Sequence, residues 1–556
     1  MKPAFLLAFL FGAIAGLPAQ TEPSRPPAPE KTSPVIAAQL KGVRLGSDPA
    51  APAGAAEGID LSGAPWLESG GLRTALGARL GRPLSFADID AMIREIKTAS
   101  AGAGRPFINV LVPAQDITRG VLTLVVLEGK IGQIKIEGEK WFSEASYRAA
   151  LHLVPGQTIA RDRLNADLDW LGRSGYRRAT VEAAPGERVG LTDLTVQVEE
   201  QRPWRFHAGY SDTGTATTDD ERIMAGVAWG NAFGRGEELS YQLVTSPDLK
   251  TSVSHSGSYT VPIDRWHHVF RVDAAWSTIR ADIPAPFDSK GYSWQVGLNY
   301  EIPLHDFQMG PAVAGTHSFT AGFDVKETNN NIEFSNIPVT DNTTQILQFR
   351  ANYQVSLEDK SGRTSASLTG VFSPGGLSAN NKDAAFNGSR SGAQADYAYL
   401  NLSLRRDTKL PHGFAHVISF TGQIASANLL GSEQLGLGGA QSVRGYDEGL
   451  VYGDQGALLR NELYLPAFSL TAKLAKNLPR DSVRLLGFWD YGVVGGKHLL
   501  KDEDPNLILS SVGVGLRYQL GEHFSAQFDY GWQQKDPGFP TREAHGRGHV
   551  NVNYTW

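Results

Sequence analysis

Residues 524–533 read FSAQFDYGWQ, and this stretch decides the fold class. Apolar and polar residues alternate along it with a period of two, which predicts a β-strand with one apolar and one polar face. The apolar face holds Phe524, Ala526, Phe528, Tyr530 and Trp532, and the polar face includes Ser525, Gln527, Asp529 and Gln533. A water-filled barrel lumen accepts such a polar face, whereas Arg or Lys on the lipid side costs about 2–4 kcal/mol at mid-depth. We therefore expect this strand to form part of the wall of a membrane β-barrel.

The same alternation recurs throughout residues 202–556, where no convincing helix is predicted. Sixteen strand candidates begin near Trp204, Arg222, Glu237, Thr251, Trp266, Gly291, Gly315, Gln345, Arg363, Ala395, His412, Gln455, Ser482, Ser510, His523 and Gly546. An even number of antiparallel strands suits a barrel. The abundance of Gly (61 residues), with 17 Tyr and 11 Trp, suits turns and membrane-interface girdles.

The connections between these candidates alternate in length. Gly521-Glu522 predicts a tight turn, whereas long external loops are expected at Thr328–Thr344, Ser373–Gln394 and Ala425–Asp454. Ile302–Ala314 and Pro466–Asp481 are longer than this rule expects on the periplasmic side. A soluble β-sandwich stays open as the alternative, because its strands also carry one apolar face.

The front of the chain indicates export. Residues 1–19 combine Lys2, an apolar run too short to span a bilayer and a small-residue cleavage site, which predicts a signal peptide. Residues 20–34 form a Pro-rich linker. The absence of Cys excludes thiol chemistry and disulfides, and a net charge of -6 with a pI near 6.1 gives no basic field for nucleic acid.

Residues 35–201 repeat a mixed α and β pattern twice, as residues 35–130 and 131–201. In the first unit a strand is expected at Val35–Leu45, two helical stretches follow, and strands close the unit at Pro106–Pro113 and Val121–Glu128. The second helix, with Ser85 as its N-cap, has one apolar face of Phe86, Ile89, Met92, Ile93 and Ile96. The second unit repeats the order with strands at Gly132–Gly138, Arg177–Ala184 and Leu191–Glu199 and helices at Ser143–Leu153 and Ala160–Gly172. Such small α+β units are common and do not identify a function.

Two short motifs in the barrel region contain the candidate functional residues. The longest connection contains Val443, Arg444, Gly445 and Tyr446, and the thirteenth strand candidate contains Phe488, Asp490 and Gly492. Alternation places Asp490 on the inner wall. Arg444 can reach it only if the loop folds into the lumen, and the alternative is an exposed loop arginine with an unrelated acid.

These motifs resemble the paired signature of two-partner secretion outer-membrane transporters of the haemolysin and filamentous-haemagglutinin type. Residues 113–117 (PAQDI), 120–122 (GVL) and 126–131 (VLEGKI) resemble the end of the first POTRA domain of these proteins. The resemblance implies two periplasmic POTRA domains and a sixteen-stranded barrel in the outer membrane of a Gram-negative bacterium. It also implies that the loop between strands eleven and twelve enters the barrel and brings Arg444 to Asp490. Relatives often carry an N-terminal helix that plugs the pore, and the Pro-rich segment leaves little sequence for one.

The function implied by the resemblance is secretion of a partner polypeptide, with a large β-helical exoprotein as the expected cargo. Other expected partners are outer-membrane lipid and the outer-membrane assembly machinery, with Tyr554 and Trp556 as a C-terminal assembly signal. An assembly factor of the same superfamily is the alternative, although it usually has more POTRA repeats. A diffusion porin would not need two folded periplasmic units.

Catalysis and cofactors are not expected. A hydrolase would need a nucleophile with His and acid partners, and the chain has no phosphate-binding G-x-x-x-x-G-K loop. His267 and His268, as neighbours on a strand, would point to opposite faces, so no metal pair is expected there.

Overall fold

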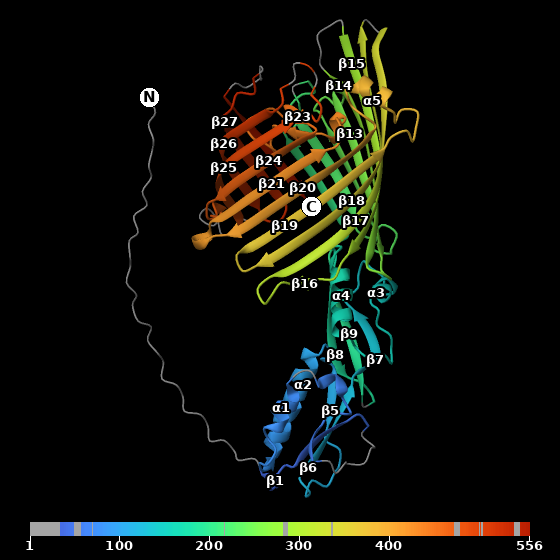
Figure 1. The fold of residues 1–556 in the computed structure, drawn as a ribbon, viewed down its shortest axis with the longest axis vertical. Coiled ribbons are helices and arrows are strands. Elements are labelled where there is room, and N and C mark those ends of the chain that lie inside the picture. Colours follow the sequence, from blue (N-terminus) through green and yellow to red (C-terminus); the bar gives the residue numbers. More distant parts are fainter. Residues whose placement is uncertain are drawn as a thin grey trace, which may run out of the picture. The chain divides into compact units, whose positions relative to one another are not determined.

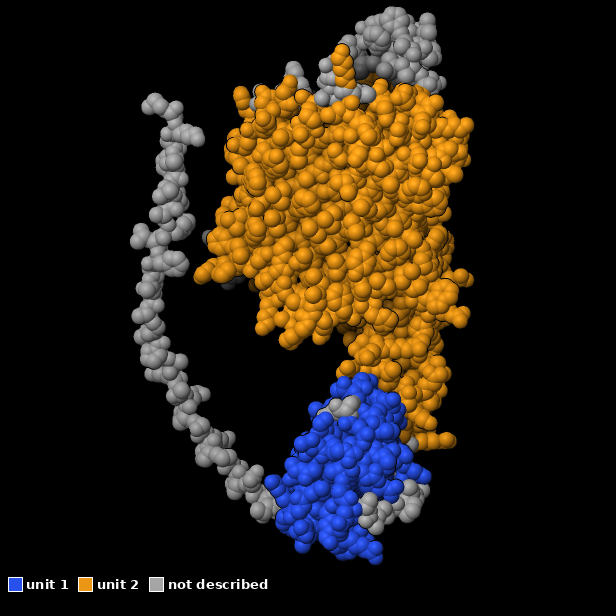
Figure 2. All heavy atoms as spheres, viewed as in Figure 1, with its two compact units in different colours: residues 1–129 blue, residues 130–556 orange. Residues whose placement is uncertain are grey.

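The computed structural model describes residues 34–48, 57–68, 71–188, 190–215, 217–281, 287–334, 337–471, 479–499, 501, 504–538 and 545–556. The predicted signal peptide and nearly all of the predicted linker lie outside these residues. The chain divides into two compact units, Met1–Gly129 and Lys130–Trp556 (Figure 2). No helix among the described residues has the length and apolar character needed to cross a membrane.

The first unit has a four-stranded sheet covered by helices. The sheet has the order β3-β2-β6-β5, in which β2 and β6 are parallel, and a separate pair joins β1 to β4. The elements are β1 (Val35–Ala37), β2 (Gly42–Gly46), β3 (Gly58–Asp60), η1 (Pro65–Leu67), α1 (Leu72–Gly77), β4 (Leu84–Ser85), α2 (Phe86–Gly102), β5 (Ile108–Leu111) and β6 (Val121–Glu128). The core packs Leu45, Leu76, Met92, Ile96 and Leu124 together.

Local chemistry explains where α2 begins. Ser85 caps the helix by accepting from the Asp88 backbone N–H, and the Asp88 carboxylate accepts from the Ser85 backbone N–H. Ile89, Met92 and Ile96 of the predicted apolar face are buried, whereas Phe86 is 58% exposed. Phe86 is the first residue of α2, and the first buried residue of the helix, Ile89, follows it three positions later.

The predicted strand Val35–Leu45 is divided into β1 and β2. Between them, the backbone of Leu40 pairs with Arg82 and Gly81 rather than with a neighbouring strand, and its side chain enters the core. These backbone hydrogen bonds of Leu40 to residues 81 and 82 separate β1 from β2, which the apolar pattern alone does not reveal.

The second unit begins with another α+β module and continues into the barrel. The module comprises β7 (Lys130–Glu137), α3 (Glu144–Ala150), α4 (Arg161–Gly172), β8 (Arg177–Pro185) and β9 (Leu191–Glu200). Its sheet has the order β7-β9-β8, with β7 parallel and β8 antiparallel to β9. The predicted β-α-α-β-β order is therefore confirmed for this module, in which Tyr147, Leu171 and Val196 form the core.

Sixteen antiparallel strands of the described chain close the barrel, and the last strand pairs with the first (Figure 1). They are β10 (Trp204–Ser211), β11 (Arg222–Trp229), β12 (Glu238–Thr245), β13 (Ser252–Ile263), β14 (His268–Ala281), β15 (Phe287–Pro303), β17 (Ala314–Phe334), β18 (Ile337–Asp359), β19 (Gly362–Pro374), β20 (Asp396–Lys409), β21 (Ala415–Ala425), β24 (Gln455–Tyr464), β25 (Asp481–Gly495), β26 (Leu507–Leu520), β27 (Phe524–Gln533) and β28 (Gly546–Thr555). The two-residue β16 (Phe307–Gln308) adds a short pairing at the rim. All sixteen predicted strands are present, and the barrel excludes the sandwich.

The burial pattern separates the two faces of the wall. Trp532, Phe528 and Val514 are exposed on the outside, whereas Asp529 and Asp490 are buried inside. The connections carry η2 (Pro411–Gly413), α5 (Asp383–Ser389), η3 (Gly431–Glu433), β22 (Leu435–Leu437) and β23 (Val451–Gly453).

The expected long loop at Thr328–Thr344 was wrong. β17 and β18 pair through this region as a long hairpin. Its sequence is rich in Asn and Thr, and apolar alternation is limited to Ile332 with Phe334 and Ile337 with Val339, so periodicity gives little strand signal.

Candidate functional site

The connection between β21 and β24 carries the first sequence motif. Within it β22 pairs with β23, and the chain between them contains residues 443–446. Val443, Arg444 and Tyr446 are each 0% exposed. The motif is thus enclosed by the barrel wall rather than exposed on a surface loop.

Arg444 contacts the predicted partner Asp490 on β25. Its Nε donates to Asp490 Oδ2 at 2.7 Å and its Nη2 donates to Oδ1 at 2.9 Å, while the backbone N–H of Arg444 also donates to Oδ2 at 3.2 Å. Asp490 is completely buried. This bidentate, charge-assisted pairing fixes both the position and the orientation of the guanidinium.

Phe488 and Gly492, which flank Asp490 on the same inner face, complete the receptor for the loop. The guanidinium carbon of Arg444 lies 3.5 Å from the centre of the Phe488 ring, a cation–π contact. At Gly492, a Cβ atom would lie 2.7 Å from Leu437 Cδ1 and 3.0 Å from Val443 Cγ2. Each residue of the Phe488, Asp490 and Gly492 motif therefore contacts or makes room for the loop.

Gly445 and Tyr446 fasten the loop to the next strands. Gly445 has φ 90°, and a Cβ there would lie 2.5 Å from the carbonyl oxygen of Gly531 on β27. Its N–H donates to His549 Nε2 at 3.1 Å. The hydroxyl of Tyr446 lies 2.9 Å from the Ser510 carbonyl oxygen, to which it donates.

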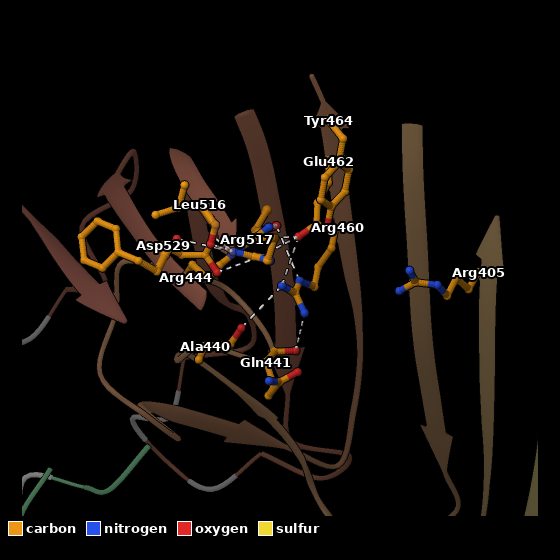
Figure 3. Close-up of polar contacts among 12 residues, drawn as sticks. Arg405, Ala440, Gln441, Arg444, Arg460, Glu462, Tyr464, Leu516, Arg517 and Asp529 are labelled. Carbon is orange, nitrogen blue, oxygen red and sulfur yellow. Dashed lines mark hydrogen bonds and ion pairs between the residues drawn. The ribbon is translucent and has the colours of Figure 1, made fainter. Parts of the chain in front are cut away.

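Arg444 belongs to a larger cluster of charges on the inner wall (Figure 3). Its Nη1 donates to Glu462 Oε1 at 2.7 Å and lies 3.6 Å from Asp529 Oδ1. Arg517 pairs with Asp529 at 2.8 Å, and Arg460 Nε lies 3.7 Å from Asp490 Oδ1. Three arginines thus face three carboxylates, which balances the charge of this enclosed cluster.

Glu462, Asp529, Arg460 and Arg517 were not predicted as site residues. Asp529 had been placed on a polar strand face, but alternation does not show which of many inward side chains contacts the loop. A search for charged inward positions on the strands beside Asp490 would have found them.

A second contact holds the same loop to another part of the wall. Glu433, which ends η3 and is 4% exposed, accepts from Lys326 Nζ on β17 at 2.7 Å. It also accepts from Gln348 on β18 at 3.1 Å and from the Tyr399 hydroxyl on β20 at 3.0 Å. Because Arg444 contacts β24 and β25, the loop extends across the lumen between two parts of the wall.

The predicted C-terminal signal residues lie at the closure of the barrel. Phe206 on β10 and Trp556 exchange two backbone hydrogen bonds of 2.9 Å, and their rings stack at 5.9 Å. Tyr554 and Trp556 are 46% and 54% exposed. Both aromatic rings are therefore available on the outer surface of the barrel.

Comparison with known proteins identifies the family to which this architecture belongs. The family model of the haemolysin secretion/activation protein ShlB/FhaC/HecB matches residues 190–518. The chain belongs to this family. Two further models match the front of the chain, an ShlB-type POTRA domain at residues 55–129 and a POTRA repeat at residues 129–201.

Named relatives agree with this assignment. The chain is 23% identical over 458 residues to the heme/hemopexin transporter protein HuxB of Haemophilus influenzae (strain 86-028NP), covering 79% of this chain and 76% of the relative. It is 22% identical to the outer membrane transporter CdiB of Dickeya dadantii (strain 3937), covering 72% and 70% of the two chains. The protein is an outer-membrane transporter of the two-partner secretion type, with its POTRA domains in the periplasm.

The fold agrees with a solved relative. The structure of CdiB from Escherichia coli superposes with a TM-score of 0.71 at 18% identity, covering 95% of this chain and 92% of that chain. At this identity the likeness supports the fold.

Proposed function

We propose that this transporter secretes one large β-helical exoprotein, which its POTRA domains capture and its barrel lumen conducts as an extended chain. The observation that carries this proposal is a cavity of about 1380 Å³ between α4 and the inner wall of the barrel. Small-molecule sites usually measure about 300–1,000 Å³. The cavity therefore suits an extended polypeptide better than a single small ligand.

Part of the cavity lining is polar, beside apolar residues such as Trp170, Leu304 and Phe420. Asp162, Asn165 and Asp169 line it from α4, and the barrel contributes Ser365, Ser367, Ser403, Ser419 and Thr421. Short hydroxyl side chains can donate to or accept from any peptide group. An extended chain can thus pass this wall without contact with lipid.

Capture of the cargo is assigned to the sheet edges of the POTRA domains. In the second α+β module β7 and β8 lie at the edges of the three-stranded sheet. Most residues of β8 after Arg177 are exposed or half-buried. A strand edge binds an extended chain through main-chain hydrogen bonds, so it can capture an unfolded polypeptide.

The loop held by Glu433 and Arg444 is proposed to narrow the lumen at rest and to shape the path of the cargo. In this proposal the role of Val443, Arg444, Gly445 and Tyr446 is to position the loop. The role of Phe488, Asp490 and Gly492 is to bind it on the barrel wall. Folding of the cargo outside the cell would make passage directional without a nucleotide. During biogenesis, Tyr554 and Trp556 are proposed to present the barrel to the outer-membrane assembly machinery and to contact lipid.

Deletion of residues 132–199 tests this proposal against the assembly-factor alternative. The deletion removes the second module while the lipid-facing strands stay in place. Secretion of one exoprotein should stop, and other outer-membrane barrels should keep their normal abundance. The measurement compares the culture supernatant and the outer-membrane proteome of the deletion strain with those of the parent.

A general fall of barrel proteins would contradict the proposal and favour an assembly factor. The control is the amount of the transporter without residues 132–199 in the outer membrane. The result is informative only where this shortened barrel is inserted.

A further inference from the structure

A cluster of metal-binding side chains lies outside the charge cluster of the lumen. His152 follows α3, Asp167 lies on α4, and His267 lies in the turn between β13 and β14. One ligand atom from each residue lies within 4.8 Å of the other two. His267 was expected on a strand beside His268, but the structure places it in the turn just before β14, where it meets residues of the α+β module.

Both ring nitrogens of His152 face acceptor oxygens. Nε2 lies 3.3 Å from the carbonyl oxygen of Arg265, and Nδ1 lies 2.9 Å from Asp167 Oδ1. A neutral imidazole carries one proton, so it can donate to only one of these oxygens. With the proton on Nε2, a cation between Nδ1 and Oδ1 satisfies both of these acceptor atoms.

His267 is directed at the same oxygen. Its Nε2 is buried without a hydrogen bond and lies 3.3 Å from Asp167 Oδ1. The residue has φ 57°, a conformation that few residues other than glycine adopt. The Trp170 ring stacks on the imidazole at 5.1 Å, and its Nε1 donates to Asp264 in the same turn at 2.8 Å. The turn is thus held so that the imidazole faces the carboxylate.

The carboxylate also needs a cation. Asp167 is 1% exposed, and its Oδ2 accepts from the backbone N–H of His152 at 2.8 Å. Oδ1 is left to the two imidazoles. A buried carboxylate is costly unless it is paired with a positive charge or coordinates a metal.

We propose that His152, Asp167 and His267 bind a zinc ion that joins the second POTRA domain to the rim of the barrel. Two imidazole nitrogens and one carboxylate oxygen are a zinc ligand set that leaves a fourth position for water. Tetrahedral zinc with bonds of about 2.0–2.1 Å separates its ligand atoms by about 3.3 Å. The observed 2.9 Å and 3.3 Å separations are close to that spacing. The Arg265 carbonyl serves as the outer partner that ligating histidines usually have.

Zinc bound by these residues would also restrain the border of the cavity. His267 and Trp170 both line the cavity between α4 and the barrel wall. A metal shared by α4 and the turn before β14 would restrain the movement of α4 relative to the barrel wall.

Zinc binding to the purified full-length protein tests the site. The protein is prepared in detergent with a histidine-free tag, stripped with a chelator and titrated with Zn²⁺ by calorimetry, with bound metal counted by mass spectrometry. The unsubstituted protein should bind one more equivalent than the His152→Gln, His267→Gln double variant. His152→Gln alone and His267→Gln alone should each lower the zinc affinity of that site. The loss should exceed the roughly 10–100-fold loss of affinity that removal of an outer-shell partner causes.

His268→Gln is the matched control. His268 is the next residue, but its Nδ1 pairs with the Tyr300 hydroxyl at 2.7 Å, away from the cluster. This variant should bind zinc as the unsubstituted protein does. Equal zinc stoichiometry and affinity in all proteins, or no binding by the unsubstituted protein, would overturn the proposal and leave a protonated His152 as the cation.

Hydrogen exchange gives a second readout that does not depend on a simple count of metal. Zn²⁺ should slow amide exchange in residues 161–172 and 264–267 of the unsubstituted protein and of His268→Gln. The double variant should show no such change. Protection that also occurs in the double variant would contradict the assignment of these ligands.

Discussion

Arg444 has no exposed surface, and its guanidinium contacts Asp490 and Glu462 directly. Arg444→Ala would leave Arg460 and Arg517 among three carboxylates. Breaking a buried ion pair by removing one partner costs about 3–5 kcal/mol, so we expect the loop to leave its place and secretion of the partner to fall at least tenfold. Secreted partner in the supernatant and protease cleavage of the loop measure this effect.

Arg405→Ala is the control for the loss of a lumen arginine. Arg405 pairs with Asp407 on its own strand and has no contact with the loop among those described. Because Arg405 also lines the cavity, the control readout is the loop: Arg405→Ala should leave protease cleavage of the loop unchanged. Normal export of the partner by both Arg444→Ala and Asp490→Ala would show that secretion does not require the Arg444–Asp490 contact.

Glycines at the loop contact provide a graded test of close packing. Gly445→Ala meets the Gly531 backbone and a φ of 90°, so it should displace the loop most. Gly492→Ala meets the side chains of Leu437 and Val443, which can shift, so its effect should be smaller. Overpacking typically costs about 1–3 kcal/mol. Thermal unfolding and protease accessibility of the loop should follow this order.

Gly487→Ala is the matched substitution on the same strand as Gly492. A Cβ there would meet only the Gly513 carbonyl oxygen, at 3.9 Å. It should leave loop accessibility unchanged. An equal effect of the substitutions at Gly487 and Gly492 would show that the loop does not need this close approach.

At the scale of elements, the pairing of β28 with β10 closes the barrel. Deletion of residues 554–556 removes the two backbone hydrogen bonds to Phe206 and the exposed aromatic rings. The amount of heat-modifiable barrel in the outer membrane should therefore fall. Electrophoresis of unheated and heated membrane samples measures folded barrel directly.

Single substitutions separate the signal from the pairing. Tyr554→Ala and Trp556→Ala keep the backbone bonds but remove the aromatic rings, and Thr555→Ala changes the position between them. We expect the two aromatic variants to assemble poorly and Thr555→Ala to assemble normally. Normal assembly of the aromatic variants would limit the role of this segment to pairing.

Elements whose faces differ in polarity were predictable from the sequence. The strands in FSAQFDYGWQ and its neighbours follow alternation because lipid and lumen impose opposite chemistry on the two faces. The end of the β17–β18 hairpin was missed because its Asn- and Thr-rich sequence carries little such contrast. The division of Val35–Leu45 was missed because the backbone hydrogen bonds of Leu40 to Gly81 and Arg82 depend on tertiary structure.

The site was only partly predictable. The two motifs led to Arg444 and Asp490 through a resemblance, since spacing alone could not show that a loop would enter the lumen. No sequence pattern indicated Glu433, because its partners Lys326, Gln348 and Tyr399 are 107, 85 and 34 residues away along the chain. Such contacts depend on the closure of the barrel.

For the molecule as a whole, the central proposal is that cargo passes through the lumen along the cavity beside α4. The chain has no Cys, so a single introduced cysteine reports only its own surroundings. Ser367 lines the cavity, while its neighbour Leu368 is 46% exposed on the outer face of the same strand. Ser367→Cys and Leu368→Cys therefore form a matched pair that differs only in the side of the wall.

The most direct measurement is disulfide crosslinking to a stalled cargo. The partner exoprotein would carry one cysteine and a domain that folds before export, which stops it within the transporter. We expect a crosslink to Ser367→Cys and none to Leu368→Cys, at equal levels of both transporters in the outer membrane. Secretion of the unstalled partner without any stalled-cargo crosslink to Ser367→Cys, or equal crosslinking to both positions, would contradict passage through the lumen.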